Sequence, residues 1–298
     1  MINIKEIKSV KLTPFTKMSA SIYGILGFIG ALVATIVLII IQATGVISQV
    51  APQFAHFNLV TGLGIPLIIL IPIGAFFITI AVSFFSVMLY NALVPRLGGI
   101  KLELDGKEIF KIPVVSFALI LSAIQAIWAF IVGLVLAAVI SPVFSLITTL
   151  PAASNITANF TNVTGATLPS GFGFGAFGTL VTLLLIIGLP ILAFVFGFIW
   201  NALFAIFYNY LVSRVSKIQL EFAAISGSLN ELKHIPVVPT ALAVALVFLL
   251  LGIISGILNH NYGEFITNFV IYFIETALIA ILYNYLAPKI GSIKLNLE

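Results

Sequence analysis

Three apolar runs of the sequence end in nearly the same phrase: YNALVPRLGG at residues 90–99, YNYLVSRVS at 208–216 and YNYLAPKIG at 283–291. In each phrase a basic residue stands five positions after the Asn. Apolar residues then alternate with mostly polar ones, which is the period of a half-buried β-strand. The triple occurrence therefore predicts three copies of one unit, in which an apolar helix ends in a short strand.

The composition places these units in a membrane. Hydrophobic residues make up 61% of the 298 residues and charged residues 7%, with a mean hydropathy of +1.27. In ordinary soluble domains about 45–50% of the residues are apolar and about 25% are charged. A membrane-crossing helix needs about 20 apolar residues, and the sequence predicts six: 19–42, 64–94, 113–141, 178–212, 236–258 and 265–287. Cysteine is absent, which excludes disulfides, thiolate metal sites and Cys nucleophiles.

The basic residues predict the orientation. All 13 Lys and Arg residues fall within 5–17, 96–111, 214–233 and 289–294. Because basic flanks stay in the cytoplasm, we expect a multi-pass protein of the cell membrane with both termini cytoplasmic. The same placement argues against a nucleic-acid patch, and the long segment 142–177 is expected outside.

The expected fold is an α-helical polytopic membrane protein with six transmembrane helices in three parallel hairpin repeats, related by a pseudo-threefold axis. The repeats span 1–106, 107–226 and 227–298. Asp105-Gly106 favours a tight hairpin between strands. We expect six short strands to form a small cytoplasmic cap in which the last strand meets the first and no edge stays open.

Pro72 and Pro190, within the second and fourth apolar runs, are expected to kink their helices. Gly252 and Gly256 form a GxxxG pair, which predicts close helix packing.

The pattern resembles a family of small two-span membrane proteins of actinobacteria and archaea, a family of unknown function. TPFTKMS at 13–19 is similar to the phrase that precedes the first span of these proteins. YNALVPRLGGIKLEL at 90–104 is similar to the phrase that ends their second span. The middle copy departs from this pattern at Ser213, Ser216 and Lys217. The resemblance implies a membrane location and a threefold assembly of single copies, and it implies no activity.

Two candidate polar layers follow from the alignment of the copies. One consists of Asn91, Asn209 and Asn284, and the other of Ser83, Asn201 and Thr276. Three amides around one axis would form a polar ring at the cytoplasmic mouth of the bundle. The alternative is structural, since Asn near a helix end commonly bonds to backbone groups.

Glu275 is a candidate intramembrane carboxyl. A charge at the bilayer centre costs roughly 2.5–3.5 kcal/mol, so we expect this group to be protonated, paired or hydrated. Its counterparts in the other copies are Val82 and Trp200, so the carboxyl breaks the repeat. A proton or cation site and a hydrogen bond to a neighbouring helix are both open.

The predicted outside loop carries three N-x-T sequons, at Asn155, Asn159 and Asn162, which indicate a glycoprotein of an archaeal or eukaryotic surface. We expect no metal and no cofactor. No catalytic motif is present, so we expect a non-enzymatic membrane scaffold or accessory subunit of the cell envelope, in contact with the lipid bilayer and with other envelope or membrane proteins. A narrow channel or transporter along the pseudo-threefold axis is the alternative.

Overall fold

The computed structural model of the protein describes residues 2–45, 58, 60–149 and 174–298. Among these residues, six helical segments are long and apolar enough to cross a membrane. They run over Leu12–Ala43, Val60–Leu97, Val114–Ile140, Gly178–Arg214, Val237–Leu258 and Glu264–Ile290. The six predicted spans are therefore confirmed as helices, and they indicate a multi-pass membrane protein.

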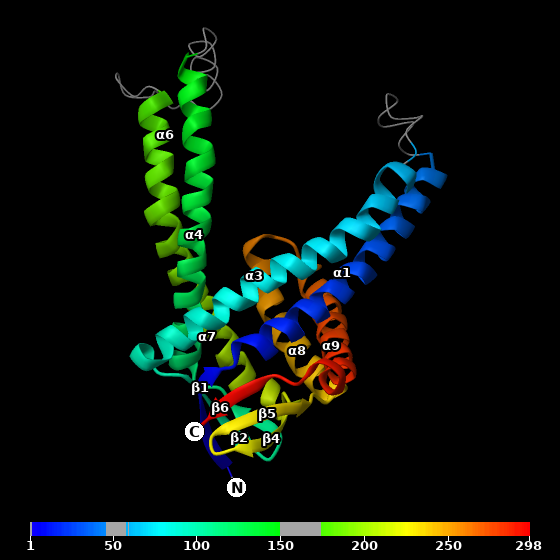
Figure 1. The fold of residues 1–298 in the computed structure, drawn as a ribbon, viewed down its shortest axis with the longest axis vertical. Coiled ribbons are helices and arrows are strands. Elements are labelled where there is room, and N and C mark those ends of the chain that lie inside the picture. Colours follow the sequence, from blue (N-terminus) through cyan, green and yellow to red (C-terminus); the bar gives the residue numbers. More distant parts are fainter. Residues whose placement is uncertain (1, 46–57, 59, 150–173) are drawn as a thin grey trace. The chain divides into compact units, whose positions relative to one another are not determined.

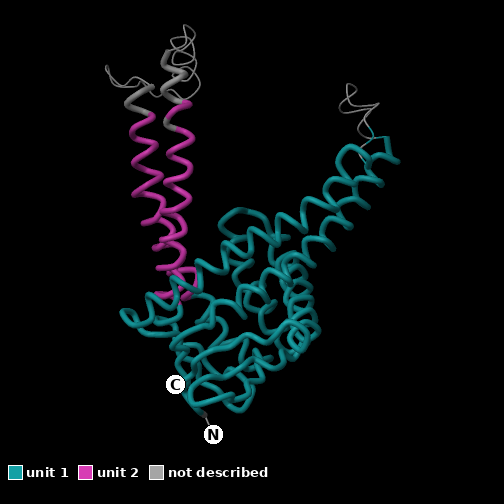
Figure 2. Tube along the Cα trace, viewed as in Figure 1, with its two compact units in different colours: residues 1–117, 203–298 teal, residues 118–202 magenta. Residues whose placement is uncertain are grey.

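The chain divides into two compact units, which Figure 2 shows in separate colours. The first unit comprises residues 1–117 and 203–298, and the second comprises residues 118–202. The first unit holds the whole sheet and all three Tyr-Asn phrases.

Two helix pairs belong to the first unit. Helix α1 (Leu12–Ala43) lies along α3 (Ile65–Leu97), and α8 (Val237–Leu258) lies along α9 (Glu264–Ile290), as Figure 1 shows. A single π-helical turn, Val60–Gly64, leads into α3. Helix α1 also contacts α9.

Glycines bring the helices of each pair close together. A Cβ placed on Gly252 of α8 would lie 2.8 Å from the Cα of Phe265 on α9. A Cβ on Gly256 would lie 2.7 Å from the carbonyl oxygen of Asn261. The GxxxG pair is therefore a packing feature, because any larger side chain would push the backbones apart.

The ends of α3 and α9 share a glycine signal that the middle copy lacks. Gly98 and Gly291 directly follow these helices with φ of +81° and +95°, a region that only glycine adopts freely. Ser216 stands at the corresponding place in the middle copy. There the helix ends earlier, at Tyr210, and a 3₁₀ turn at Val212–Arg214 continues the chain.

The second unit contains most of a third helix pair. Its helices are α4 (Val114–Thr149), α6 (Phe174–Leu183) and α7 (Leu189–Tyr210), with a π turn at Leu184–Gly188 between the last two. The π turn ends two residues before Pro190, which has no N–H to donate to the preceding turn. Helix α3 stays continuous through Pro72.

Six strands form one sheet in the order β3-β2-β1-β6-β5-β4. They are β1 (Ile2–Val10), β2 (Ile100–Asp105), β3 (Glu108–Lys111), β4 (Glu221–Ser226), β5 (Leu229–His234) and β6 (Lys294–Leu297). The neighbouring strands pair antiparallel, and β6 pairs with β1 as the sequence predicts. We call β1, β3 and β5 leading strands, because each precedes the first helix of a pair. The trailing strands β2, β4 and β6 follow the second helix.

The sheet closes on itself through the residues just before β4. The N–H of Ile109 donates to the carbonyl of Ile218 at 2.9 Å, and the N–H of Leu220 donates to the carbonyl of Lys107 at 2.8 Å. These bonds join β3 to the start of the β4 segment, so the strands form a closed ring. The contact is a single bridge, between Glu108 and Gln219, and among the described strands β4 itself pairs only with β5.

The apolar core of the first unit lies where the ring meets the helices. One cluster joins Leu102 and Leu104 of β2 to Tyr208 of α7 and Val247 of α8. A second cluster joins α1, β5 and α9, and its buried members include Met18, Ile22, Leu232 and Tyr283. Alternate strand residues thus face the core, as the period of two predicts.

Candidate functional site

The three Tyr-Asn pairs lie at the ends of α3, α7 and α9, where these helices meet the ring. Each Tyr hydroxyl donates a hydrogen bond to a carbonyl of the leading strand and accepts one from an N–H at the start of the trailing strand or just before it. For Tyr90 the partners are Ile7 at 2.6 Å and Ile100 at 3.2 Å. Tyr208 bonds to Ile109 and Ile218, and Tyr283 bonds to Leu232 and Ile293.

The Asn side chains make an equally regular set of bonds. Each amide oxygen accepts from the N–H of one residue, and the amide nitrogen donates to the carbonyl of that same residue. The partners are Val10 for Asn91, Ile112 for Asn209 and Ile235 for Asn284, at distances from 2.7 to 2.9 Å.

This bonding satisfies backbone groups at the place where each leading strand gives way to a helix. A backbone that leaves a sheet loses its neighbour, and an amide side chain supplies the same donor and acceptor as a further peptide group. We call each Tyr-Asn pair with its four backbone partners a clamp. Because both amide atoms bind backbone, the geometry favours the structural alternative for Asn91, Asn209 and Asn284. A ring of three amides around an axis stays a prediction.

The clamps are shielded from solvent. Tyr208 is 0% exposed, Tyr283 is 1% exposed and Tyr90 is 7% exposed. Hydrogen bonds in such surroundings have no water to replace them, so each clamp fixes a helix end to two strands.

A glutamate accompanies each clamp, a feature that the sequence predictions missed. Glu6, Glu108 and Glu231 each stand immediately before the residue whose carbonyl accepts the Tyr hydroxyl. The signal was present in the sequence, since counting back four positions from the residue held by each Asn reaches a glutamate in all three copies. It emerges only once those partner residues are known.

The three glutamates have different partners. Glu6 accepts from the N–H of Gly99 at 2.7 Å, whereas Glu108 pairs with the ammonium of Lys217 at 2.7 Å. Glu231 lies 3.5 Å from the ammonium of Lys233. The hydrogen bond from Gly99, helped by Lys8, lowers the pKa of Glu6 below its ordinary value of 4.5.

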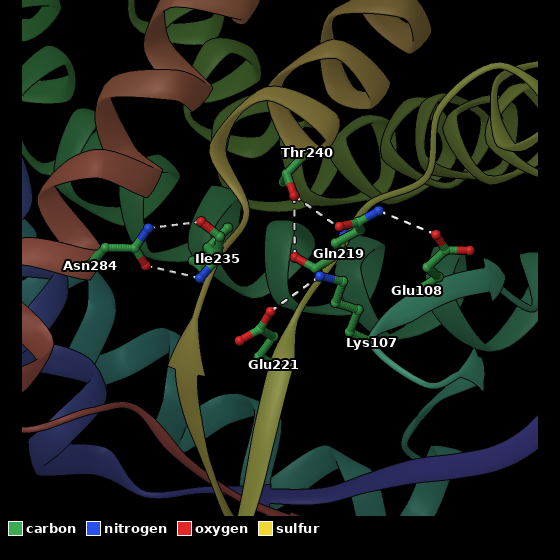
Figure 3. A network of polar contacts seen from close by, with 7 residues as sticks. All are labelled: Lys107, Glu108, Gln219, Glu221, Ile235, Thr240 and Asn284. Atoms are coloured by element: carbon green, nitrogen blue, oxygen red, sulfur yellow. Dashed lines mark hydrogen bonds and ion pairs between the residues drawn. The ribbon is translucent and has the colours of Figure 1, made fainter.

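The middle copy has an additional network, which Figure 3 shows together with the Asn284 bonds. Thr240 of α8 accepts from the backbone N–H of Gln219 at 3.1 Å and donates to its carbonyl at 3.2 Å. The Gln219 side chain donates to Glu108 at 3.2 Å. These bonds hold the trailing segment of the middle copy, in which Ser216 stands where the other two copies have a glycine.

A polar cavity opens in the ring, with a volume of about 410 Å³. Its charged and amide lining comes from Asn3, Lys5, Lys107, Glu221 and Asn230. The ammonium of Lys107 lies 3.4 Å from the Glu221 carboxylate. The ring thus presents polar groups of both signs beside its apolar core.

The second candidate layer has no common bonding pattern. Ser83 donates to the carbonyl of Thr79 in its own helix at 2.5 Å. Asn201 donates to the side chain of Gln125 at 3.3 Å within the second unit. Thr276 is half-buried on α9. A ring of these three side chains stays a prediction.

Glu275 lies near the middle of α9 and is half-buried. It makes no hydrogen bond or ion pair with the residues that the structure describes. Tyr23 of α1 lies close enough to interact with it electrostatically. The carboxyl therefore sits beside the contact between α1 and α9.

The three sequons, at Asn155, Asn159 and Asn162, lie outside the described residues. Within 2–45, 58, 60–149 and 174–298, no group of three or more His, Asp or Glu side chains is placed to hold a metal ion.

Comparison of the chain with protein-family models, with curated proteins and with solved structures gave no match.

Proposed function

We propose that the protein is a non-enzymatic integral membrane scaffold or accessory subunit of the cell envelope. Its proposed architecture is three parallel helical-hairpin repeats around a pseudo-threefold axis, with the strand ring as a cytoplasmic cap. The observation that carries this proposal is that the three clamps have the same hydrogen-bonding pattern. Their polar atoms bind backbone and join helix ends to strands, which makes the ring a rigid base for the helix pairs.

The charge pattern supports the proposed orientation of the ring. The basic residues of the chain lie in or beside the strands, from Lys5 to Lys294, and basic flanks are retained on the cytoplasmic side. Both ends of the described chain belong to the ring, since β1 and β6 pair with each other.

Cysteine labelling tests this orientation directly, because the natural chain has no cysteine. Ser226→Cys places a thiol in the ring, and Asn259→Cys places one at the opposite end of α8; both positions are exposed. A membrane-impermeant maleimide added to intact cells should label Asn259→Cys and leave Ser226→Cys unlabelled. Once the cells are opened, it should label Ser226→Cys as well. Labelling of Ser226→Cys in intact cells would refute a cytoplasmic ring.

A scaffold needs a partner surface, and the outer side of the ring supplies exposed apolar residues. Ile4 of β1 is 65% exposed and Ile225 of β4 is 45% exposed. A membrane or envelope protein that binds there would cover these side chains.

The function is tested by purifying the full chain from its native membranes and by measuring solute flux in liposomes. We expect one partner in constant proportion, lost in Ile4→Lys and kept in the matched control Ile4→Val, together with no flux. The scaffold proposal fails if no partner is retained by the unsubstituted chain or if the liposomes pass ions or small solutes.

A second candidate function, a narrow ion or small-solute conduit, is favoured by one observation. Glu275 has no hydrogen-bond or ion-pair partner among the described residues, although it lies in the middle of an apolar helix, where a charge is costly. Carboxyls in such positions often belong to ion or proton paths. Flux through liposomes that Glu275→Gln abolishes would favour the conduit, and equal flux in both proteins would exclude this carboxyl from it.

A further inference from the structure

We infer that the polar cavity of the strand ring binds a small sugar phosphate. The ammoniums of Lys5 and Lys107 bind the phosphate group. The side-chain oxygens of Asn230 and Glu221 accept hydrogen bonds from the sugar hydroxyls. The site uses none of the clamp residues, so it is independent of the scaffold proposal.

Three residues of the cavity wall occupy the same position in the three copies. Lys5, Lys107 and Asn230 each stand immediately before the glutamate that accompanies a clamp. Polar side chains from one register of the three leading segments thus converge on a single cavity of about 410 Å³. Small-molecule sites commonly have volumes of about 300–1,000 Å³, so the cavity is large enough for a ligand of this class.

The register of the sheet places Lys5 on the inner face of the ring. Lys5 is opposite Leu102, and Asn3 is opposite Leu104. Directly opposite residues of neighbouring strands project to the same face, and Leu102 and Leu104 are buried in the core. An inward charge on an outermost strand can prevent edge pairing, but β1 pairs with both β2 and β6. The inward ammonium of Lys5 therefore needs another explanation.

Several polar groups of the cavity have hydrogen-bonding capacity to spare. The Lys5 ammonium makes no ion pair or hydrogen bond with the residues that the structure describes. Asn230 is 7% exposed, and its Nδ2 donates to the carbonyl of Ser228 at 2.8 Å, whereas its Oδ1 has no partner within the described part of the chain. Lys107 contacts Glu221 at 3.4 Å, and an ammonium has three donors, so it can bind a second acceptor.

These groups match the two parts of a sugar phosphate. A phosphate carries about 1.5–2 negative charges at pH 7, which suits two ammoniums on separate segments. The amide oxygen of Asn230 and the carboxylate of Glu221 are acceptors for hydroxyls. An anion without hydroxyls leaves these oxygens without donors, and a neutral sugar leaves the Lys5 ammonium unpaired. A ligand that carries both groups therefore satisfies more of the cavity than either part alone.

The test measures binding of glucose 6-phosphate to the purified full chain in detergent, with glucose and inorganic phosphate as separate probes. Glucose lacks the anion, and inorganic phosphate lacks the sugar hydroxyls. We expect glucose 6-phosphate to bind at least about tenfold more tightly than either probe. Absence of glucose 6-phosphate binding would overturn the inference, and so would equal binding of glucose or of inorganic phosphate.

Lys5→Gln should weaken glucose 6-phosphate binding about tenfold, because it removes one of the two ammoniums. The matched control is Lys101→Gln. Lys101 is exposed on β2 and stands next to the inward-facing Leu102, so alternation places it on the outer face of the ring. The control should bind as the natural chain does, and equal binding by Lys5→Gln and the natural chain would overturn the inference.

Lys5→Met separates ligand binding from a structural role. An inward ammonium without a partner costs stability, so this variant should have an unchanged or higher melting temperature without ligand. It should also lose most of the rise in melting temperature that glucose 6-phosphate gives the natural chain. A Lys5→Met chain that melts at a lower temperature, yet is stabilised by glucose 6-phosphate as much as the natural chain, would assign Lys5 to the fold and overturn the inference.

Discussion

Removal of one clamp hydroxyl should destabilise the protein far more than removal of an exposed hydroxyl beside it. Tyr208→Phe keeps the aromatic side chain in place. It deletes only the hydroxyl oxygen, which bonds to the carbonyl of Ile109 and the N–H of Ile218. Tyr208 is 0% exposed, so no water takes the place of the hydroxyl. A buried backbone group without its partner costs about 1–3 kcal/mol, which gives about 2–6 kcal/mol for the two groups.

The matched control lies two residues away in the same helix. Tyr210 is 60% exposed, so Tyr210→Phe should change the free energy of unfolding by less than about 0.5 kcal/mol. Tyr283→Phe should resemble Tyr208→Phe, since Tyr283 is 1% exposed. Tyr90→Phe should cost less, because Tyr90 is 7% exposed and some water reaches it.

The assay is equilibrium unfolding in mixed micelles with increasing SDS, followed by near-ultraviolet circular dichroism of the aromatic side chains. A double-mutant cycle of Tyr208→Phe with Asn209→Ala should give an interaction energy of about 0.5 kcal/mol or more, because both side chains hold the same strand. If Tyr208→Phe unfolds no more readily than Tyr210→Phe, the reasoning about the clamps is wrong.

Three further predictions concern close packing and charge. Gly99→Ala should lower the free energy of unfolding by about 1–3 kcal/mol, since its Cβ would lie 2.3 Å from the carbonyl oxygen of Ile7. Gly30→Ala is the neutral control in the same unfolding assay, because no atom of the described neighbours lies within 4 Å of the added Cβ. Gly252→Ala should cost a similar amount, and a melting temperature equal to that of Gly30→Ala would contradict the close approach of α8 and α9. The pKa of Glu6 in the folded protein is below its ordinary value of 4.5. The ionised carboxylate therefore stabilises the fold fully at pH values above 4.5, and this contribution is lost as the pH falls through the folded-state pKa. The advantage of the natural chain over Glu6→Gln should therefore be full at pH 7 and disappear in acid; an advantage that grows as the pH falls would refute the assignment.

The elements of this fold could largely be predicted from the sequence because each depends on a local pattern. Apolar length alone predicts the six helices, and the alternation after Ile100, Ile218 and Ile293 predicts the trailing strands. The pairing of the last strand with the first followed from the repetition of the phrases.

The bonding of the clamps could not be predicted, because it depends on which backbone groups the tertiary structure leaves without partners. The sequence places Asn91, Asn209 and Asn284 in register, and that register is equally compatible with a ring of amides and with backbone contacts. The choice depends on Val10, Ile112 and Ile235, whose N–H and carbonyl groups lie at the point where each leading strand leaves the sheet.

The sequence by itself thus determined the six long apolar helices, the strand segments and the recurrence of the Tyr-Asn phrases, since these follow from composition and period. Only the tertiary structure decided how the ring closes, because the bonds of Ile109 and Leu220 join segments more than 100 residues apart along the chain. The same holds for the glutamates beside the clamps, since hydrogen bonding depends on neighbours that are distant in the sequence.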